Sequence, residues 1–225
     1  MNKAEKFVTM LAAFIGCVAG LWGAYTGYDA SKFKQPFDEH DQLAKSYVAE
    51  ITSAEKRNDI NEVTRVRLLY EAFEEKSRAA KQIVQIVAPI ESLAAVQLSA
   101  KQGTTLRELM VKTADGPTRA VLSSTTLGAA YLALNDYGDA ATQLSVATSK
   151  KNDPNAFALK ATAYSGLASR TTDPNVKQKH EAAAVESFTA ALKASPKSTK
   201  LTDFALANPG LKVILEAKGI ELTNR

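Results

Sequence analysis

Residues 127–147 read LGAAYLALNDYGDAATQLSVA, and the fold class follows from this stretch. Its apolar residues recur with the period of a helix. Gly128 and Ala140 are small enough for two helices to cross closely, and the larger Tyr131 and Leu144 fill the space beside the crossing. Beyond the N-terminal segment, the chain contains no run of alternating apolar and polar residues bounded by hairpin turns. The sequence therefore predicts an all-α protein.

Composition narrows the class of protein. The chain has 225 residues, of which 45% are hydrophobic and 23% charged, so it is neither disordered nor of low complexity. The net charge of +4 is small and evenly spread, which argues against a nucleic-acid partner. One cysteine excludes a disulfide framework, and two histidines 140 residues apart, His40 and His180, offer little for a metal site.

The N-terminal segment is long and uncharged. Residues 7–28 read FVTMLAAFIGCVAGLWGAYTGY, 22 residues without a charge, after a short basic tail at residues 1–6. A helix of this length measures about 33 Å and can cross a hydrocarbon core of about 30 Å. The sequence predicts a transmembrane helix, in preference to a buried core helix, a cleaved signal peptide or a lipoprotein signal that ends at Cys17.

One face of this predicted helix carries small residues. Four glycines recur on it at spacings of four, three and four residues: Gly16, Gly20, Gly23 and Gly27. Small residues let two helix backbones approach closely in lipid. The face therefore predicts contact with another membrane protein, and the alternative is a passive anchor.

Orientation depends on the flanking lysines. Lys3 and Lys6 precede the span, and Lys32, Lys34 and Lys45 follow it. The numbers of basic residues on the two sides are therefore nearly equal. A short basic tail before the first apolar run is typical of an uncleaved signal anchor. We expect a single-pass protein of a bacterial inner membrane with its C-terminal bulk in the periplasm.

Residues 29–116 are expected to form a helical hairpin or bundle with its linkers. After a short linker, a helix is expected from Asp38 to about residue 57. Its inward side chains are Leu43, Tyr47, Val48 and Ile51. Asp59 and Glu62 have the spacing of a capping box that opens a second helix. The expected stripe on that helix is Val63, Val66, Tyr70, Phe73, Ser77, Ala80, Val84 and Val87. Packing of the stripe onto the preceding helix is favoured over a coiled coil with a partner.

Prolines and caps divide this part of the chain further. Pro36 is expected to close the linker, and Pro89 to end the second helix. Thr105 and Glu108 have capping-box spacing and predict the start of a short third helix. The break at residues 115–117, Asp-Gly-Pro, predicts the main boundary, with a second domain at residues 117–225.

Residues 121–196 resemble two tetratricopeptide repeats, a family in which about 34 residues fold as paired helices with small and aromatic residues at fixed offsets. The first unit matches at Leu127, Gly128, Tyr131, Ala140, Leu144 and Ala147, and the second at Phe157, Ala161, Tyr164, Ala184, Phe188, Ala191 and Pro196. An insertion of about eleven residues near 169–179 predicts a turn or longer loop. The resemblance implies a tetratricopeptide-like α-solenoid of about two repeats. Residues 211–215 predict a C-terminal capping helix.

The resemblance also implies a binding surface. In this family the first helix of each pair lines a concave groove that binds a peptide or protein segment. The corresponding positions are Leu122, Thr125, Ala129, Leu132, Ala158, Thr162 and Ser165. Whether they bind a partner or only pack helices stays open, because two repeats are fewer than the usual three.

The sequence contains few patterns that are typical of catalysis or of cofactor binding. It contains no glycine-rich phosphate loop, no nucleophile elbow and no metal-spaced histidine pair. His40 has acidic neighbours, but consecutive residues on a helical turn point apart. We therefore expect no enzyme, and no catalytic, cofactor-binding or metal-binding residues.

Three lysines, Lys193, Lys197 and Lys200, gather near one expected helix end. Solvation and complementation of the helix dipole explain them more simply than a lipid-binding patch. Such a patch usually holds about 4 to 8 basic residues next to the membrane.

These features together predict a membrane-anchored interaction protein that acts as an accessory subunit, assembly factor or chaperone-like adaptor of a larger membrane complex. The alternative is a self-associating anchor, a homo-oligomer formed through the glycine face and the stripe at residues 63–87. A lipid or small-molecule carrier would need an apolar cavity, which a sequence does not reveal.

Overall fold

The computed structural model describes residues 31–95, 97–114 and 122–222, with side chains from residue 41 onward. Every helix or strand found in these residues is an α-helix, which confirms the predicted all-α class. The helices are α2 Ser31–Lys56, α3 Ile60–Glu91, α4 Ala100–Lys112, α5 Ser124–Ala133, α6 Tyr137–Lys150, α7 Pro154–Arg170, α8 Pro174–Ala194, α9 Thr199–Leu206 and α10 Pro209–Ala217.

Two predictions fall outside the described residues. The expected transmembrane helix at residues 7–28, with its basic tail and glycine face, is one, and the expected boundary at residues 115–117 is the other. Within the part of the chain that is described, no helix combines the length and apolarity that a bilayer requires.

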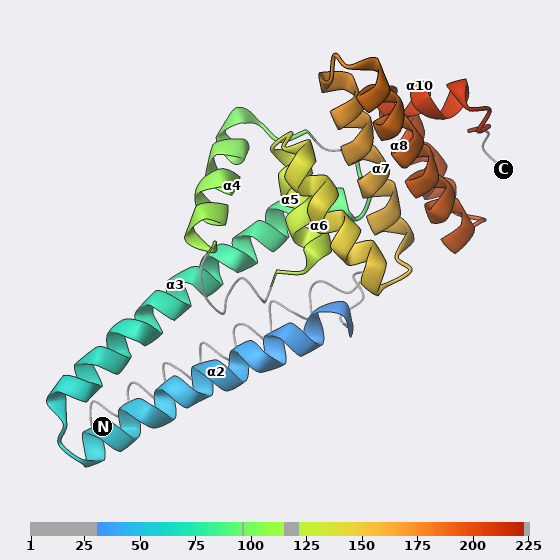
Figure 1. Cartoon of the computed structure of the whole chain (residues 1–225). Helices are drawn as coiled ribbons and strands as arrows, with labels where there is room; N and C mark the ends of the chain where they lie inside the picture. The colour runs from blue at the N-terminus through green and yellow to red at the C-terminus, as the bar shows by residue number, and fades with distance from the viewer. Residues whose placement is uncertain (1–30, 96, 115–121, 223–225) are drawn as a thin grey trace.

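Helices α2 and α3 form a long antiparallel hairpin, the arm, which projects from the other helices (Figure 1). The ring centroid of Tyr47 on α2 lies 6.1 Å from that of Tyr70 and 5.6 Å from that of Phe73, both on α3. Ile51 and Val66 complete the buried core of the arm. Val66, Tyr70 and Phe73 of the predicted stripe therefore pack onto the preceding helix, as expected. The expectation is wrong for Ala80, Val84 and Val87, which pack with the later helices.

The ends of the two arm helices differ in part from expectation. Asp59 caps α3 as predicted, because its side chain accepts a hydrogen bond from the Glu62 N–H at 3.1 Å. The expected linker end at Pro36 is wrong, since α2 already begins at Ser31. Pro89 does not end α3 either, because a proline removes one backbone donor without blocking the residues that follow it.

Leu93 marks where α3 gives way to a loop. Its φ of 62° is a left-handed conformation. Residues at helix ends often adopt this conformation, and they are usually glycines. The side chain is only 5% exposed, so burial offsets the cost of this backbone geometry. The end of α3 is therefore set by tertiary packing rather than by Pro89.

Helix α4 begins five residues before the predicted start at Thr105, and this expectation is wrong. The Ser99 side chain accepts from the Gln102 N–H at 3.3 Å, while Gln102 Oε1 accepts from the Ser99 N–H at 3.0 Å. This is a complete capping box, and it satisfies two backbone donors that the helix itself leaves free. Gly103 then lies inside the helix.

The main core joins the C-terminal half of α3 to α4 and to every helix from α5 to α10. Helices α5 and α6 form one helical hairpin, and α7 and α8 form the next, packed against the first through α6 and α7. The insertion expected near residues 169–179 leaves a turn of only three residues, because it lengthens the second hairpin. Helices α7 and α8 have 17 and 21 residues, against 10 and 14 in α5 and α6.

The C-terminal end of the core contains two short helices. The helix predicted near residues 211–215 is present as α10, whose Leu211 and Leu215 are fully buried. Helix α9 was not expected from the sequence. Its Leu201, Phe204 and Ala205 join the main core.

Candidate interaction surfaces

Glycines allow close helix crossings within the first hairpin, between α5 and α6, and between the two hairpins, where α6 meets α7. A Cβ atom on Gly128 of α5 would lie 2.8 Å from Leu144 Cδ2 on α6, closer than real Cβ contacts allow. A Cβ atom on Gly166 of α7 would lie 2.5 Å from the Tyr137 ring, which also has the Arg170 guanidinium 4.6 Å from its centroid. The sequence predicted a close crossing at Gly128 and Ala140 with Leu144 beside it, and the structure shows that close approach at Gly128, where Leu144 fills the space.

Most of the residues expected to line a groove lie in the interior. Leu122, Ala129, Leu132, Ala158 and Ser165 are buried, and Thr125 and Thr162 are half-buried. Ala129 and Ala158 have no exposed surface at all. Helix α5 contacts α3, α6 and α7, so the chain's own helices cover its sides. As the helices stand, a peptide would reach the two threonines and not the other five side chains.

Helix α10 covers part of the same face on α7. The first turn of α10 lies so close that a Cβ atom on Gly210 would be 3.0 Å from Ser165 Oγ. Helix α10 also contacts α8 and α9. Ser165, expected in a groove, is thereby placed under the C-terminal helix.

A polar contact that sequence reasoning missed joins α3 to α7. Asn155 Nδ2 donates a hydrogen bond of 3.1 Å to the Glu91 carbonyl oxygen. The Glu91 side chain itself is only 4% exposed, at the very end of α3. The two residues are 64 positions apart, so no local pattern could have paired them.

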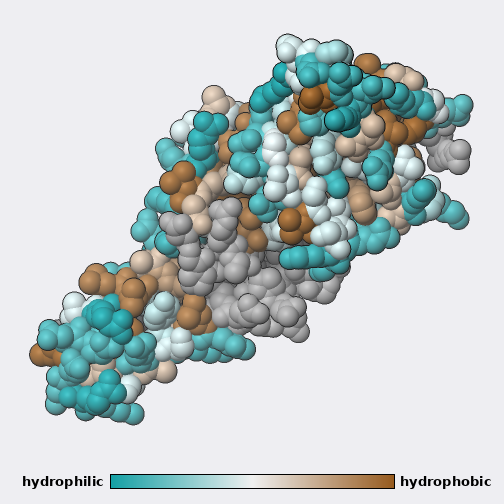
Figure 2. Space-filling model, viewed as in Figure 1, coloured by the Kyte–Doolittle hydropathy of each residue, from teal (hydrophilic) through white to brown (hydrophobic). Residues whose placement is uncertain are grey.

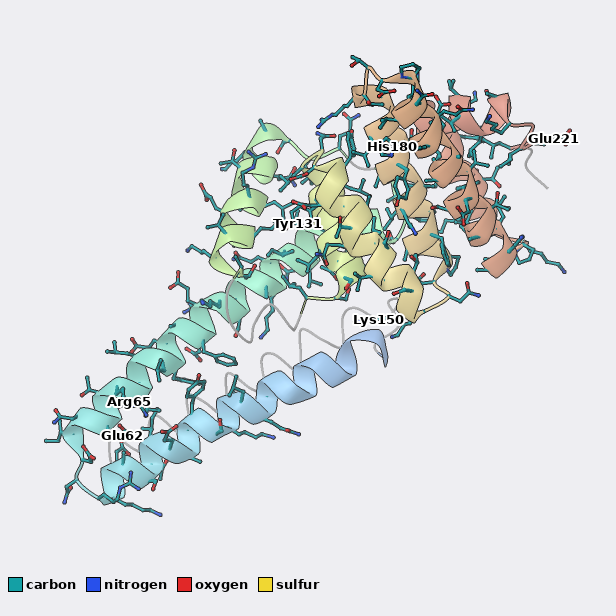
Figure 3. The ribbon with its side chains drawn as sticks, in the orientation of Figure 1. Glu62, Arg65, Tyr131, Lys150, His180 and Glu221 are labelled. Carbon is teal, nitrogen blue, oxygen red and sulfur yellow. The ribbon has the colours of Figure 1, made fainter. Side chains whose placement is uncertain are left out.

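Most of the ion pairs among the described residues lie on the arm. Arg65 donates to Glu62 at 2.7 Å and to Glu50 of α2 at 3.2 Å, and Arg67 reaches Glu55 at 2.6 Å. Figure 3 shows Glu62 and Arg65 near the tip of the arm. The hydrogen bond from Arg65 lowers the pKa of the Glu62 carboxyl. These groups are exposed, so each pair contributes little stability.

Burial also shifts the pKa of two side chains on the arm, Tyr70 and Lys81. Desolvation, helped by the Glu74 carboxylate, raises the pKa of the Tyr70 hydroxyl to about 12. Desolvation lowers the pKa of Lys81, against the opposing charges of Asp41 and Glu74. The Glu74 carboxylate thus acts on both side chains.

Exposed apolar side chains lie along the arm and at the end of α4. Figure 2 shows apolar residues on the surface of the arm. Ile60 and Leu68 of α3 are 78% and 62% exposed, and Val111 of α4 is 71% exposed. Scattered apolar residues are ordinary on a protein surface, so these three do not by themselves define a partner.

A smaller aromatic cluster lies on the second hairpin. The Tyr164 and His180 rings stack with centroids 6.1 Å apart, and Lys160 Nζ lies 5.9 Å from the Tyr164 centroid. Among the described residues, no three histidine, cysteine or carboxylate side chains come together as metal ligands. Comparisons with protein-family models, curated proteins and solved structures found no match for this chain.

Proposed function

We propose that this protein is a membrane-anchored interaction module, an accessory subunit, assembly factor or chaperone-like adaptor of a larger membrane complex. Residues 7–28 would anchor it as a single-pass protein of a bacterial inner membrane. The body would lie in the periplasm. The glycine face would bind another membrane protein, and the helical body would present contact surfaces for a protein segment.

The close crossing of α5 and α6 at Gly128 carries the proposal. It supports a tetratricopeptide-like arrangement, because a small residue at this position lets Leu144 enter the crossing. The second crossing, where Tyr137 packs on Gly166, supports a repeated use of paired helices. Repeats of this kind expose extended surfaces that bind proteins rather than perform chemistry.

The buried groove positions change where contact is expected. A peptide in the groove would have to displace the chain's own helices, because Ala129 and Ala158 have no exposed surface. We therefore propose that the glycine face provides the primary contact. The half-buried Thr125 and Thr162 remain available to a protein segment.

Gly20→Leu tests this proposal. The added side chain should hold two helix backbones apart and release the partner, while Leu keeps the helix in the membrane. The matched control is Val18→Leu, which adds bulk at similar depth on the opposite side of the helix. The measurement is recovery of a stoichiometric partner after purification of the full chain in mild detergent. Equal recovery with both variants contradicts the role of the glycine face.

Two further measurements test the other parts of the proposal. Crosslinking through Cys17, the single cysteine, separates a partner protein from a second copy of the chain. Homodimer crosslinks would favour the self-associating anchor, although the α3 stripe is already packed on α2 around Tyr47. Protease protection of the body in intact cells tests the orientation. Cleavage from the cytoplasmic side would contradict a periplasmic body.

A further inference from the structure

Five exposed lysines lie at one end of the two helical hairpins. They are Lys150, Lys151, Lys193, Lys197 and Lys200, here called the lysine edge. Helices α6 and α8 both pack on α7 and run opposite to it, so their C-terminal ends point the same way (Figure 1). Lys150, labelled in Figure 3, lies at the end of α6. The structure thus adds two lysines to the three that are close in sequence.

The lysine edge carries excess positive charge. Among the described residues none of its five members makes an ion pair. Three carboxylates belong to the same region: Asp153 at the start of α7, Asp203 on α9, and the buried Glu91 at the end of α3. Asp153 accepts a hydrogen bond from the Asn155 N–H at 3.0 Å. Five lysines against three carboxylates, of which Glu91 is buried, leave this surface basic.

The register of the α2–α3 hairpin shows which residues of α3 lie level with the start of α2. The contacts of Tyr47 with Tyr70 and Phe73 set the register of the antiparallel hairpin. Counting outward from these contacts places Ser31 level with residues 86–89, in the last turns of α3. The charge of Asp41, which acts on Lys81, agrees with this register. Ser31 is therefore level with the last turns of α3 along the axis of the hairpin, while the two helices diverge toward this end (Figure 1).

The end of α3 is in turn joined to the lysine edge. The Glu91 carbonyl accepts from Asn155 in the first turn of α7, and the short turn before α7 follows Lys150 and Lys151. The start of α2 and the lysine edge consequently lie at the same end of the molecule. The apolar segment at residues 7–28 ends three residues before α2 begins.

We propose that the lysine edge rests on anionic lipid headgroups beside the anchor, an inference that rests on the membrane anchoring proposed above. Five basic residues reach the number, about 4 to 8, that lipid-binding patches hold. The lysines project from three helix ends and make a broad surface, which suits the spread charge of a bilayer. Lysine is depleted in protein–protein interfaces, so an acidic protein segment fits this composition less well.

Amine-reactive labelling of the full chain tests the proposal. The protein is reconstituted in vesicles of phosphatidylcholine, or of phosphatidylcholine with phosphatidylglycerol, and labelling is followed lysine by lysine with mass spectrometry. We expect labelling of the lysine edge to be about fivefold slower in the anionic vesicles, the factor that corresponds to about 1 kcal/mol per basic residue. High salt should restore it. Lys177 and Lys179, at the opposite end of α8, should label equally in both vesicles.

A charge-matched pair of variants sharpens this experiment. Replacement of Lys150, Lys151, Lys197 and Lys200 by Gln should abolish the protection of Lys193. Replacement of Lys101, Arg107, Lys177 and Lys179 by Gln removes the same charge from exposed positions elsewhere and should leave that protection intact. Loss of protection in both variants would overturn a specific role for the lysine edge.

The other outcomes separate the two proposals. Equal labelling in both vesicles, with the protein retained after alkaline extraction, overturns the lipid contact and leaves the anchor standing. Release of the protein by alkaline extraction contradicts the anchor itself. Protection in native membranes but not in purified anionic vesicles also overturns the lipid contact, and it assigns the lysine edge to another component of the membrane.

Discussion

At Gly128 a single missing side chain determines how closely two helices approach. Leu144 occupies the space that a Cβ atom would need, and Leu144 itself is fully buried. Gly103, inside α4, has open space at the same position. The same residue type is therefore required at one site and dispensable at the other.

We expect Gly128→Ala to lower the free energy of unfolding by about 1–3 kcal/mol, because overpacking forces Leu144 or the backbone to move. Gly103→Ala is the control and should raise it by about 0.5–1 kcal/mol, since alanine costs less backbone entropy in a helix. Urea denaturation followed by circular dichroism measures both. Equal effects of the two substitutions would contradict the close crossing.

At the scale of an element, α4 shows how two similar signals compete. Ser99 with Gln102 and Thr105 with Glu108 both have capping-box spacing, and the structure uses the first. Because the helix starts earlier, Leu106 and Leu109 lie in its interior turns, and both are buried. Propensity alone does not distinguish the two starts, because both leave the same apolar residues on one face.

Ser99→Ala should therefore destabilise the protein by about 1 kcal/mol, the usual cost of losing an N-cap. Thr105→Ala should change the free energy of unfolding by less than about 0.5 kcal/mol, because Thr105 is exposed within the helix. Thermal denaturation compares the two variants with the parent chain. A larger loss for Thr105→Ala would place the helix start where the sequence first indicated it.

The ion pairs of the arm predict a pH dependence. Arg65 lowers the pKa of Glu62 below its ordinary value of 4.5, so the stabilisation is present above pH 4.5 and is lost as the pH falls through the lower pKa of the folded state. Arg65→Gln should therefore reduce stability at neutral pH and have no effect at about pH 2. Chemical denaturation at both values measures this. Arg107→Gln, an exposed substitution on α4, is the control and should have a negligible effect at either pH.

At the scale of the whole molecule, the two buried cores differ greatly in size. The arm core has four buried side chains, Ile51, Val66, Tyr70 and Phe73, with partly buried neighbours from α2. The main core collects residues from eight helices, α3 to α10. Local opening costs less where fewer apolar contacts are lost.

Hydrogen exchange should therefore be fastest in α2 and in the tip-proximal half of α3, and slowest in α5 to α8. The full chain, measured by hydrogen–deuterium exchange with mass spectrometry, gives this order directly. Tyr47→Ala should accelerate exchange in the arm and leave α7 unchanged, because Tyr47 belongs to the arm core alone. Uniform protection across the arm and the main core would show that they open as one unit.

The sequence by itself determined what depends on nearby residues. The helical class, the stripe on α3, the Asp59 cap and the small residue at Gly128 all follow from helical periodicity, local hydrogen bonding or the size of one side chain. The same local reasoning explains its errors at Pro36, Pro89 and Thr105. A proline or a capping motif indicates where a helix can begin or end, and packing with distant residues determines which of these positions is used.

Only the tertiary structure decided which distant segments meet. It buried Ala129 and Ala158, where an open groove was expected, because α5 has helices on its sides and α10 lies over Ser165. It joined Glu91 to Asn155, and it brought Lys150 to the same end as Lys193. Such meetings depend on the lengths and crossing angles of several helices at once, and no local stretch of sequence encodes them.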